Sequence, residues 1–295
     1  MCDQGLDPPT PLSLLLVEME VLWDLDARGR LTGEAPPLAV AESSEGCAAL
    51  VGAEVPDDLA EELGRLAALP SAPGQPPVAI SRGEALLAGV CGPTVASAAP
   101  SYLVEPGTAY ASSARIVTHA DHASAGDSGG LLRDGNPGDW PESEWRDLLE
   151  GRLGPWAMAY EEGQVVAVCH TPVASGRGAE AGVWTRPGFR GRGHAAAVTA
   201  HWARSFPPGR HLFYSTTSDN RSSQRVASRL GLRPLGRVWR LSRPGEEGAH
   251  AERPWPYGPP PHPDGPPSDD PPADDPPAPA PDGPAPDEQG PNARR

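Results

Sequence analysis

Arginine and glycine alternate in one short segment, Arg190-Gly191-Arg192-Gly193-His194-Ala195, which directly precedes a stretch with helical spacing. Glycine lets the backbone approach a ligand closely, and a helix N-terminus presents unpaired N–H groups and the positive end of the helix dipole. The two arginines add charge-assisted hydrogen-bond donors. The segment therefore predicts a turn that binds a phosphate or pyrophosphate group, and a solvated basic loop is the alternative.

This turn lies in the most basic part of an acidic chain. The 295 residues carry a formal net charge of −15, and all basic side chains except histidine are arginines. Residues 1–175 hold 8 arginines against 26 acids, residues 176–245 hold 13 against 2, and residues 246–295 hold 3 against 11. The local excess of 11 positive charges in the middle segment suits a ligand with several phosphate charges, whereas the acidic remainder argues against a nucleic-acid partner.

The elements that must position the turn follow from periodicity. Strands are expected at Arg115–Thr118, Pro155–Tyr160, Gln164–Cys169, Glu180–Thr185, His211–Ser215 and Arg237–Leu241. Helices are expected after Thr118, from a capping box at Asp139–Glu142 to Leu149, and at Gly193–Arg204 and Asn220–Leu230. The order predicts an α/β (α+β) fold, with a mixed sheet and helices packed on it.

Residues 1–110 are predicted to form an accessory α+β region. Glu18–Leu25 alternates as a strand does, and Leu38–Ala41 is expected to return beside it in a hairpin. Asp57–Leu69 places leucines at helical spacing. The sequence indicates no function for this region.

The last 50 residues contain 17 prolines and 11 acids, and almost no aliphatic side chains. Such a segment cannot bury enough apolar area to offset its ordering entropy. We therefore expect a disordered tail at residues 244–295, after a folded domain at residues 111–243.

The four cysteines, Cys2, Cys47, Cys91 and Cys169, form no CxxC pair. Their scatter argues against a zinc site and a disulfide framework, so we expect no metal and a cytoplasmic location. The apolar stretch Leu12–Val17 is too short to cross a membrane, and the N-terminal residues lack the basic charges of a signal peptide. We expect neither a targeting segment nor a membrane partner.

The residues around the turn follow a larger pattern. Arg190, Gly193 and Ala195 fit the motif Gln/Arg-x-x-Gly-x-Gly/Ala, and the segment Thr185–Arg190 precedes it. Asn220 opens a helix that ends at a Gly-aliphatic pair, Gly231-Leu232. In these features, and in the order of strands and helices, residues 111–243 resemble the GNAT superfamily of acyl-CoA-dependent N-acetyltransferases. The resemblance implies a mixed, mostly antiparallel sheet flanked by helices.

The resemblance also implies a site for acetyl-CoA, the co-substrate. In this family the pantetheine arm lies between the fourth and fifth strands, which splay apart, so backbone groups of Val183, Trp184 and Thr185 would pair with it. Asn220 and Ser223 would touch the pantetheine or the thioester, or would instead be a helix cap and a solvated position. The pyrophosphate would meet Arg190, Gly191, Arg192, Gly193, His194 and Ala195.

Amide formation needs a base for the amine and a proton for the departing thiolate. Some GNAT members carry a general-base glutamate at the position of Glu180, which could instead pair with an arginine. His170, at the end of the preceding strand, is the rival base or a structural histidine. The family's usual acid, a tyrosine seven residues after the asparagine, is replaced here by Ala227. Three alternatives for the source of the proton are then open: Tyr214, a water molecule, or no general acid at all.

The function predicted from these features is transfer of an acetyl group from acetyl-CoA to a small-molecule or peptide amine. One alternative, suggested by Ala227, is a non-catalytic GNAT-fold domain that binds acyl-CoA as a sensor or scaffold. The other is a dinucleotide-binding oxidoreductase, because Gly191-x-Gly193-x-x-Ala196 fits a loose dinucleotide fingerprint.

Two further patterns have less weight. Arg221, Arg225 and Arg229 recur every four residues and form a cationic helix face, which contacts either the 3′-phosphate of the coenzyme or solvent. Gly126–Gly130 spells the nucleophile sequence of trypsin-like proteases, but the nearest histidines are adjacent in sequence rather than on a separate barrel, so we treat it as coincidence.

Overall fold

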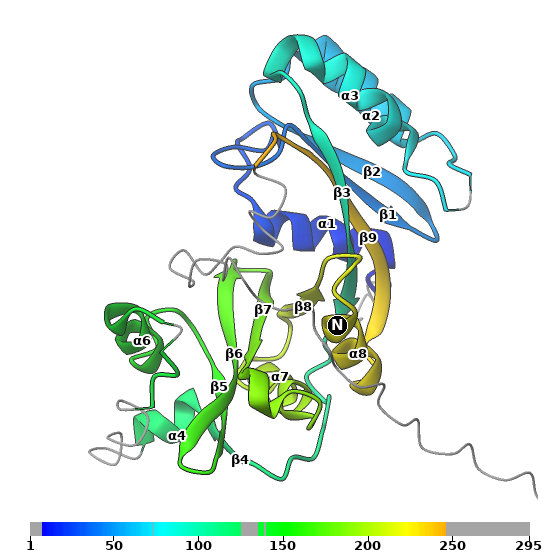
Figure 1. Cartoon of the computed structure of the whole chain (residues 1–295). Helices are drawn as coiled ribbons and strands as arrows, with labels where there is room; N and C mark the ends of the chain where they lie inside the picture. The colour runs from blue at the N-terminus through cyan, green and yellow to red at the C-terminus, as the bar shows by residue number, and fades with distance from the viewer. Residues whose placement is uncertain (1–7, 73, 125–134, 139, 246–295) are drawn as a thin grey trace, which may run out of the picture. The chain divides into compact units, whose positions relative to one another are not determined.

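The computed structural model describes residues 8–72, 74–124, 135–138 and 140–245. Within these ranges nine strands form one sheet, in the order β2-β1-β9-β3-β8-β7-β6-β5-β4 (Figure 1). The strands are β1 (Leu38–Ser43), β2 (Gly46–Val51), β3 (Val95–Leu103), β4 (Arg115–Thr118), β5 (Ala157–Glu161), β6 (Gln164–Ala174), β7 (Gly178–Thr185), β8 (His211–Ser215) and β9 (Arg233–Ser242). The helices are α1 (Pro11–Leu22), α2 (Asp57–Ala67), α3 (Val78–Cys91), α4 (His119–Ser124), α6 (Glu142–Leu149), α7 (His194–Ala203) and α8 (Arg221–Arg229).

Neighbouring strands are antiparallel throughout, except for β7 and β8, which run parallel. A parallel pair needs a crossover connection, and α7 supplies it. The structure confirms the predicted fold class, a mixed and mostly antiparallel sheet flanked by helices.

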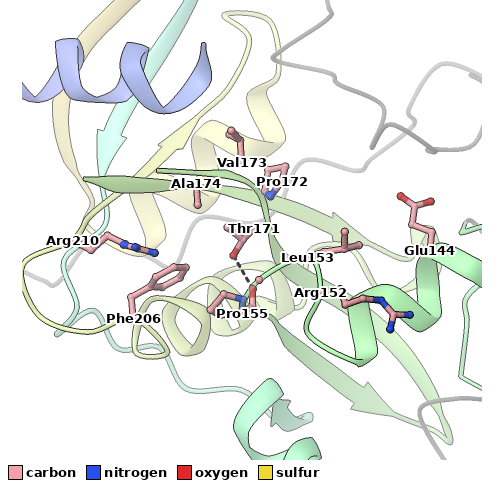
Figure 2. A pocket seen from close by; sticks show the side chains of 11 residues that line it. Glu144, Arg152, Leu153, Pro155, Thr171, Pro172, Val173, Ala174, Phe206 and Arg210 are labelled. Atoms are coloured by element: carbon pink, nitrogen blue, oxygen red, sulfur yellow. Dashed lines mark hydrogen bonds between the residues drawn. The ribbon is translucent and has the colours of Figure 1, made fainter. Parts of the chain in front are cut away.

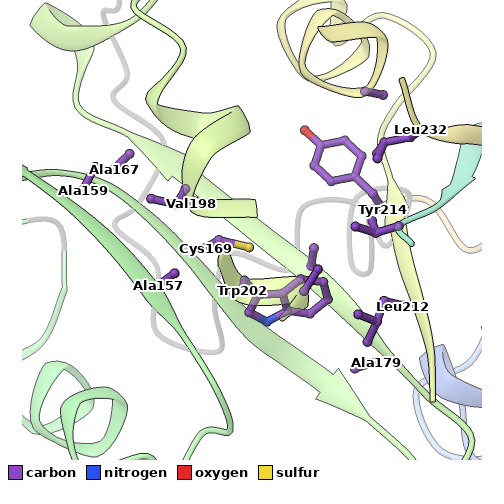
Figure 3. Close-up of a cluster of buried hydrophobic side chains, with 14 of the residues drawn as sticks. Ala157, Ala159, Ala167, Cys169, Ala179, Val198, Trp202, Leu212, Tyr214 and Leu232 are labelled. Atoms are coloured by element: carbon purple, nitrogen blue, oxygen red, sulfur yellow. The ribbon is translucent and has the colours of Figure 1, made fainter. Parts of the chain in front are cut away.

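Different helices cover the two faces of the sheet. Trp202 of α7 and Ala227 of α8 pack with Tyr214 in one hydrophobic cluster (Figure 3). Phe213, the neighbour of Tyr214 on β8, packs instead with Met19 of α1. Successive side chains of a strand point to opposite faces, so α7 and α8 lie on one face of β8 and α1 lies on the other.

The strand predicted at Glu18–Leu25 is wrong, because most of this segment belongs to α1. Thr10 caps the helix, and its hydroxyl oxygen accepts a hydrogen bond from the Ser13 N–H over 3.3 Å. The buried residues of α1 are Leu14, Leu15, Val17, Glu18, Met19 and Val21. A helix buried around so much of its circumference shows no clear amphipathic period, so a short stretch of its sequence can resemble strand alternation.

The predicted hairpin also differs from the structure, because β1 pairs with β2 and not with the segment at residues 18–25. The predicted helix at Asp57–Leu69 is confirmed as α2, and the predicted strands at Arg115–Thr118 and His211–Ser215 are confirmed as β4 and β8. Pro141 occupies the N-cap of α6 without a side-chain hydrogen bond.

Strands from the first 110 residues complete the sheet. β3 lies between β8 and β9, and β1 pairs with the other edge of β9. The sheet thus continues across the predicted boundary at residue 110, and the division of the chain into domains stays a prediction. Four features singled out in the sequence lie wholly or mostly outside the described residues: Cys2, Gly126–Gly130, Asp139 and the tail, whose residues 246–295 are not described.

Among the residues that the structure describes, none of the helices has the length and apolar character needed to cross a bilayer. In the same ranges no three His, Cys, Asp or Glu side chains come together in a way that could bind a metal ion.

Candidate functional site

The turn from Arg190 to Gly193 leads from the end of β7 into α7. Gly191 and Gly193 have φ angles of 79° and 85°, in the left-handed region that strains any residue with a β-carbon. A β-carbon on Gly193 would also lie 3.0 Å from ring atoms of Tyr110. Gly193 is the N-cap of α7 and no side chain caps the helix, so the N–H groups of its first turn have no partner within the helix.

Arginine side chains surround this turn. Arg190 and Arg192 are exposed, and Arg192 donates a hydrogen bond of 3.2 Å to Glu161 Oε1. Arg229 of α8 donates a hydrogen bond of 3.4 Å to the carbonyl oxygen of Gly191. One member of the predicted cationic helix face therefore reaches the turn. Uncapped N–H groups and arginines together are typical of a site for a phosphate group.

His194 begins α7 with its side chain buried. Its Nε2 lies 3.0 Å from Glu161 Oε2, and its Nδ1 lies 3.5 Å from Ser112 Oγ. The imidazole ring therefore points into the protein, and only the backbone N–H of His194 remains available to a phosphate. Glu161 and Ser112 cannot be predicted from the sequence pattern, because both lie outside the turn and its flanking elements.

β7 and β8 separate beyond Glu180. The two strands pair only where Gly178, Ala179 and Glu180 lie opposite residues 211–213. Farther along, β8 keeps its antiparallel pairing with β3, in which Ser215 lies opposite Ser101. The edge of β7 from Ala181 to Thr185 is left without a strand partner in the described structure, so a fork opens between β7 and β8.

The register of β6 and β7 determines which backbone groups face this fork. The N–H of Arg186 donates to the carbonyl oxygen of Val166 over 2.9 Å. Antiparallel pairs alternate between bonded and non-bonded, so the N–H and C=O of Trp184 turn toward β6 while those of Val183 and Thr185 turn toward the fork. Of the three predicted pantetheine contacts, Val183 and Thr185 turn backbone groups toward the fork, where the Thr185 carbonyl oxygen accepts a hydrogen bond of 3.4 Å from Arg190 Nε.

Glu180 is the acidic group at the point where the strands separate. Its Oε1 accepts hydrogen bonds from the backbone N–H and the hydroxyl of Ser215, over 2.7 and 2.8 Å, and its Oε2 has no hydrogen-bond partner. Burial raises the pKa of Glu180 to about 7, against the opposing effect of the two bonds from Ser215. None of the ion pairs between described residues involves Glu180. A carboxyl group that titrates near neutral pH can serve as a general base.

The comparison with protein families agrees with this geometry. Residues 110–233 match the family model described as the acetyltransferase (GNAT) domain. This part of the chain is a GNAT domain. No curated protein matches the chain.

Solved structures with low similarity carry related descriptions. A GCN5-related N-acetyltransferase from Kribbella flavida is 19% identical, over 79% of this chain and 95% of its own, with a TM-score of 0.40. A GNAT-family structure from Novosphingobium aromaticivorans is 19% identical, over 81% and 97%, with a TM-score of 0.39. A tandem GNAT protein from the clavulanic acid biosynthesis pathway is 15% identical, over 80% and 98%, with a TM-score of 0.39. These values are too low to support an argument about substrate or activity.

His170, the other predicted candidate for the base, lies opposite Gly182 on β7. A β-carbon on Gly182 would lie 2.5 Å from the imidazole ring, and the ring also contacts the edge of Trp140 with 5.6 Å between centroids. Burial lowers the pKa of His170 to about 3. A group with so low a pKa has little driving force to accept a proton at neutral pH, so His170 is the weaker of the two candidate bases.

The start of α8 holds the other predicted contacts. Asn220 Oδ1 accepts a hydrogen bond of 3.0 Å from the N–H of Ser223, so Asn220 is the N-cap of α8. Tyr214 packs in the same hydrophobic cluster as Ala227, and its hydroxyl interacts with the side chain of Ser223. Burial raises the pKa of Tyr214, which keeps its hydroxyl protonated and able to donate. Tyr214 therefore lies beside the position where the family usually has its acid.

A pocket of about 410 Å³ lies at the other end of α7 from the turn (Figure 2). Its lining residues are Glu144, Arg152, Leu153, Gly154, Pro155, Thr171, Pro172, Val173, Ala174, Phe206 and Arg210. Burial raises the pKa of Glu144 to about 7, and neither of its carboxyl oxygens has a hydrogen-bond partner. None of the predicted site residues lines this pocket, although its lining residue Val173 lies opposite Glu180 in the pairing of β6 and β7.

Proposed function

We propose that this protein is an N-acyltransferase that moves an acetyl group from acetyl-CoA to an amine. The observation that carries the proposal is the order of features from β7 to α7: Glu180 at the fork, then the backbone of Val183 and Thr185 on the edge that has no strand partner, then the uncapped turn at Gly193. These three features correspond to the needs of the reaction, which are a base, a surface for the pantetheine arm and a pocket of positive potential for the pyrophosphate.

The turn would hold the pyrophosphate through the N–H groups of Gly193, His194 and Ala195 and through the guanidinium groups of Arg190 and Arg192. Extended pantetheine has amide groups, which can pair with the backbone of Val183 and Thr185 as another strand would. Asn220 and Ser223 remain proposed contacts, because capping uses only the Oδ1 atom of Asn220 and leaves its amide NH₂ available.

The reaction balances as a direct transfer. The carboxylate of Glu180 takes a proton from the acceptor ammonium, and the neutral amine nitrogen attacks the thioester carbonyl carbon. A C–N bond forms, the C–S bond breaks, and the nitrogen loses its second proton to solvent or to the base. The departing thiolate receives a proton from the hydroxyl of Tyr214, which is then replenished from solvent.

Calorimetry with acetyl-CoA, followed by a thiol-release assay against a panel of amines, tests the function. We expect saturable binding with a dissociation constant below about 1 mM and release of CoA with at least one amine. Failure to bind both acetyl-CoA and CoA would contradict the proposal. Tight binding with no transfer to any amine would support the sensor alternative, which is motivated by the buried Ala227 at the usual acid position.

The oxidoreductase alternative has less support from the structure. A dinucleotide-binding fold uses a parallel sheet and a tight turn directly between strand and helix. Here the sheet is mostly antiparallel, and the 3-10 helix Pro187–Phe189 separates β7 from Gly191. A fluorescence titration with NADH is the discriminating measurement, and we expect no saturable binding.

Tyr214→Phe should lower kcat by about 10-fold or more and leave the dissociation constant of acetyl-CoA within about 2-fold, because the variant removes only the proton donor. Tyr160→Phe is the matched control, since Tyr160 packs with the α6 cluster away from α8. Steady-state kinetics and calorimetry check both variants. An unchanged kcat in Tyr214→Phe would show that water, and not Tyr214, protonates the departing thiolate.

A further inference from the structure

Two buried carboxyl groups meet at the fork, and one of them comes from outside the GNAT domain. Glu18 of α1 is 0% exposed. The hydroxyl of Ser101 donates a hydrogen bond to Glu18 Oε2, and Glu18 Oε1 has no hydrogen-bond partner. A buried carboxyl group with one unsatisfied oxygen is costly, so its retention calls for a physical explanation.

The partner serines place Glu18 and Glu180 side by side. Ser101 of β3 and Ser215 of β8 are opposite each other in the pairing of these strands. Ser101 holds Glu18, and Ser215 holds Glu180 through two hydrogen bonds to its Oε1. The two oxygens without partners are therefore one from each carboxyl group, Glu18 Oε1 and Glu180 Oε2. Two carboxylates can only accept hydrogen bonds, so neither can satisfy the other unless a proton is present.

The raised pKa values of the two carboxyl groups indicate that such a proton is present. Burial, and next the negative charge of Glu180, raise the pKa of Glu18 well above its ordinary value. Burial raises the pKa of Glu180 to about 7. Like charges this close cannot both be retained in a buried site, so one proton stays with the pair near neutral pH.

We propose that Glu18 is a positioning residue for Glu180: its protonated carboxyl group donates a hydrogen bond to Glu180 Oε2, while Ser215 holds Oε1. Both carboxyl oxygens of Glu180 are then fixed, and Glu18 Oε1 gains the partner that it otherwise lacks. The N-terminal helix thereby becomes part of the candidate site. The role of this pair in catalysis rests on the proposed function. The sharing of one proton between Glu18 and Glu180 is independent of that function.

Other titratable groups around Glu180 do not take over this role. Cys169 of β6 and Tyr214 of β8 lie near enough to sense its charge, and burial raises the pKa of both, so they stay neutral around pH 7. His170 of β6 stays neutral because burial lowers its pKa to about 3. From α1, Glu18 is the group that interacts with Glu180. Glu18 and Glu180 therefore titrate as a pair.

The direct test follows the glutamate side-chain carboxyl carbons by NMR in ¹³C-labelled protein across the pH range in which the protein stays folded. In the native protein we expect Glu18 and Glu180 to titrate in separate steps, one near neutral pH and one higher, and Glu144→Gln identifies the signal of Glu144, whose pKa burial also raises to about 7. Glu18→Gln should abolish the upper step. Glu180→Gln should leave a single step that is at least about 10-fold more acidic than the upper step of the native protein, because the like charge is gone.

Two results of the titration would overturn the proposal. One is a Glu18 step that does not move in Glu180→Gln, and the other is ordinary acidity for both carboxyl groups in the native protein. Neither result depends on acyl transfer. If acetyl-CoA fails to bind while the coupled titration is observed, the proposed function fails and the carboxyl pair stands.

A comparison of Glu18→Gln and Glu18→Leu separates positioning from packing. The Gln amide can still donate to Glu180, whereas Leu fills similar space without a donor. We expect Glu18→Gln to keep kcat within about 3-fold of the native value. Glu18→Leu should lower the acid constant seen in the acid limb of the kcat/KM profile by about 10-fold, so that this limb moves to higher pH. Equal profiles for the two variants would show that Glu18 only fills space. Should Glu18→Leu not fold, the NMR titration of the Gln variants decides alone.

Discussion

Gly193→Asp should weaken the binding of acetyl-CoA by about 100-fold or more. The new carboxylate would stand at the N-terminus of α7, where the proposed pyrophosphate binds, and would repel it. The backbone is at a φ of 85°, which a side chain strains, and the β-carbon would approach the Tyr110 ring to 3.0 Å. A 100-fold loss corresponds to about 2.7 kcal/mol, within reach of one repulsive charge and local strain together. Calorimetry with acetyl-CoA measures the change.

Gly209→Asp is the matched control for this variant. Gly209 also has a positive φ, of 91°, but a β-carbon there meets no atom within 4 Å, and the residue precedes β8 at the other end of α7. We expect the control to share any general cost of adding a side chain at positive φ and to keep its affinity within about 2-fold. Equal affinities of the two variants for acetyl-CoA would contradict the proposal that the turn binds the coenzyme.

The turn itself could be found from the sequence, because its signal is local. Two glycines between arginines, directly before a helical stretch, specify both the conformation of the turn and its charge. The inward orientation of His194 could not be found in this way. It depends on Ser112, which precedes β4, and on Glu161 at the end of β5. Both residues are far from His194 in the sequence, so the residues next to His194 carry no sign of these contacts.

Strands were predictable where their own side chains carry the pattern, as at Arg115–Thr118 and His211–Ser215. β3 (Val95–Leu103) is rich in alanine and serine and has a proline, so its propensity for strand is low. It is a strand because β8 and β9 hold it from both sides. Local propensity therefore located the elements of the GNAT domain but missed the strand that joins it to the N-terminal region.

The same limit applies to the candidate site. Glu180 was identified by its place before the turn, but its partner Glu18 lies in a segment that the sequence suggested was a strand. Only the pairing of Ser101 with Ser215 shows that the two carboxyl groups are neighbours. The sequence therefore reveals a site made from one continuous stretch, and it does not reveal a side chain that the sheet brings in from the N-terminal helix.

Glu180→Gln should lower kcat by about 100-fold or more while making the protein more stable at alkaline pH. The Gln oxygen can still accept the hydrogen bonds from Ser215, so the fold is preserved, but no base remains. The proposed reaction needs the carboxylate, so the kcat/KM of the native protein should rise with pH and level off above about 7, the pKa of Glu180. In the variant this acid limb should disappear from the pH-rate profile.

Glu180→Gln should raise the free energy of unfolding while it lowers kcat, because burial favours the protonated form of the Glu180 carboxyl group. A carboxyl group whose pKa is raised in the folded state contributes stability that is fully present below its unfolded pKa and is lost as the pH rises through about 7. Gln imitates the protonated form and has no such loss. Denaturant unfolding at pH 8 should therefore show the variant to be about 1–3 kcal/mol more stable than the native protein.

Glu144→Gln separates catalysis from burial in this experiment. Burial also raises the pKa of Glu144 to about 7, but Glu144 lies on α6, away from the fork. The control should gain stability at alkaline pH in the same direction and should keep both kcat and the acid limb. An acid limb that persists near pH 7 in Glu180→Gln would place the base elsewhere, and loss of the limb in both variants would show that a buried carboxyl group affects the rate only through the fold.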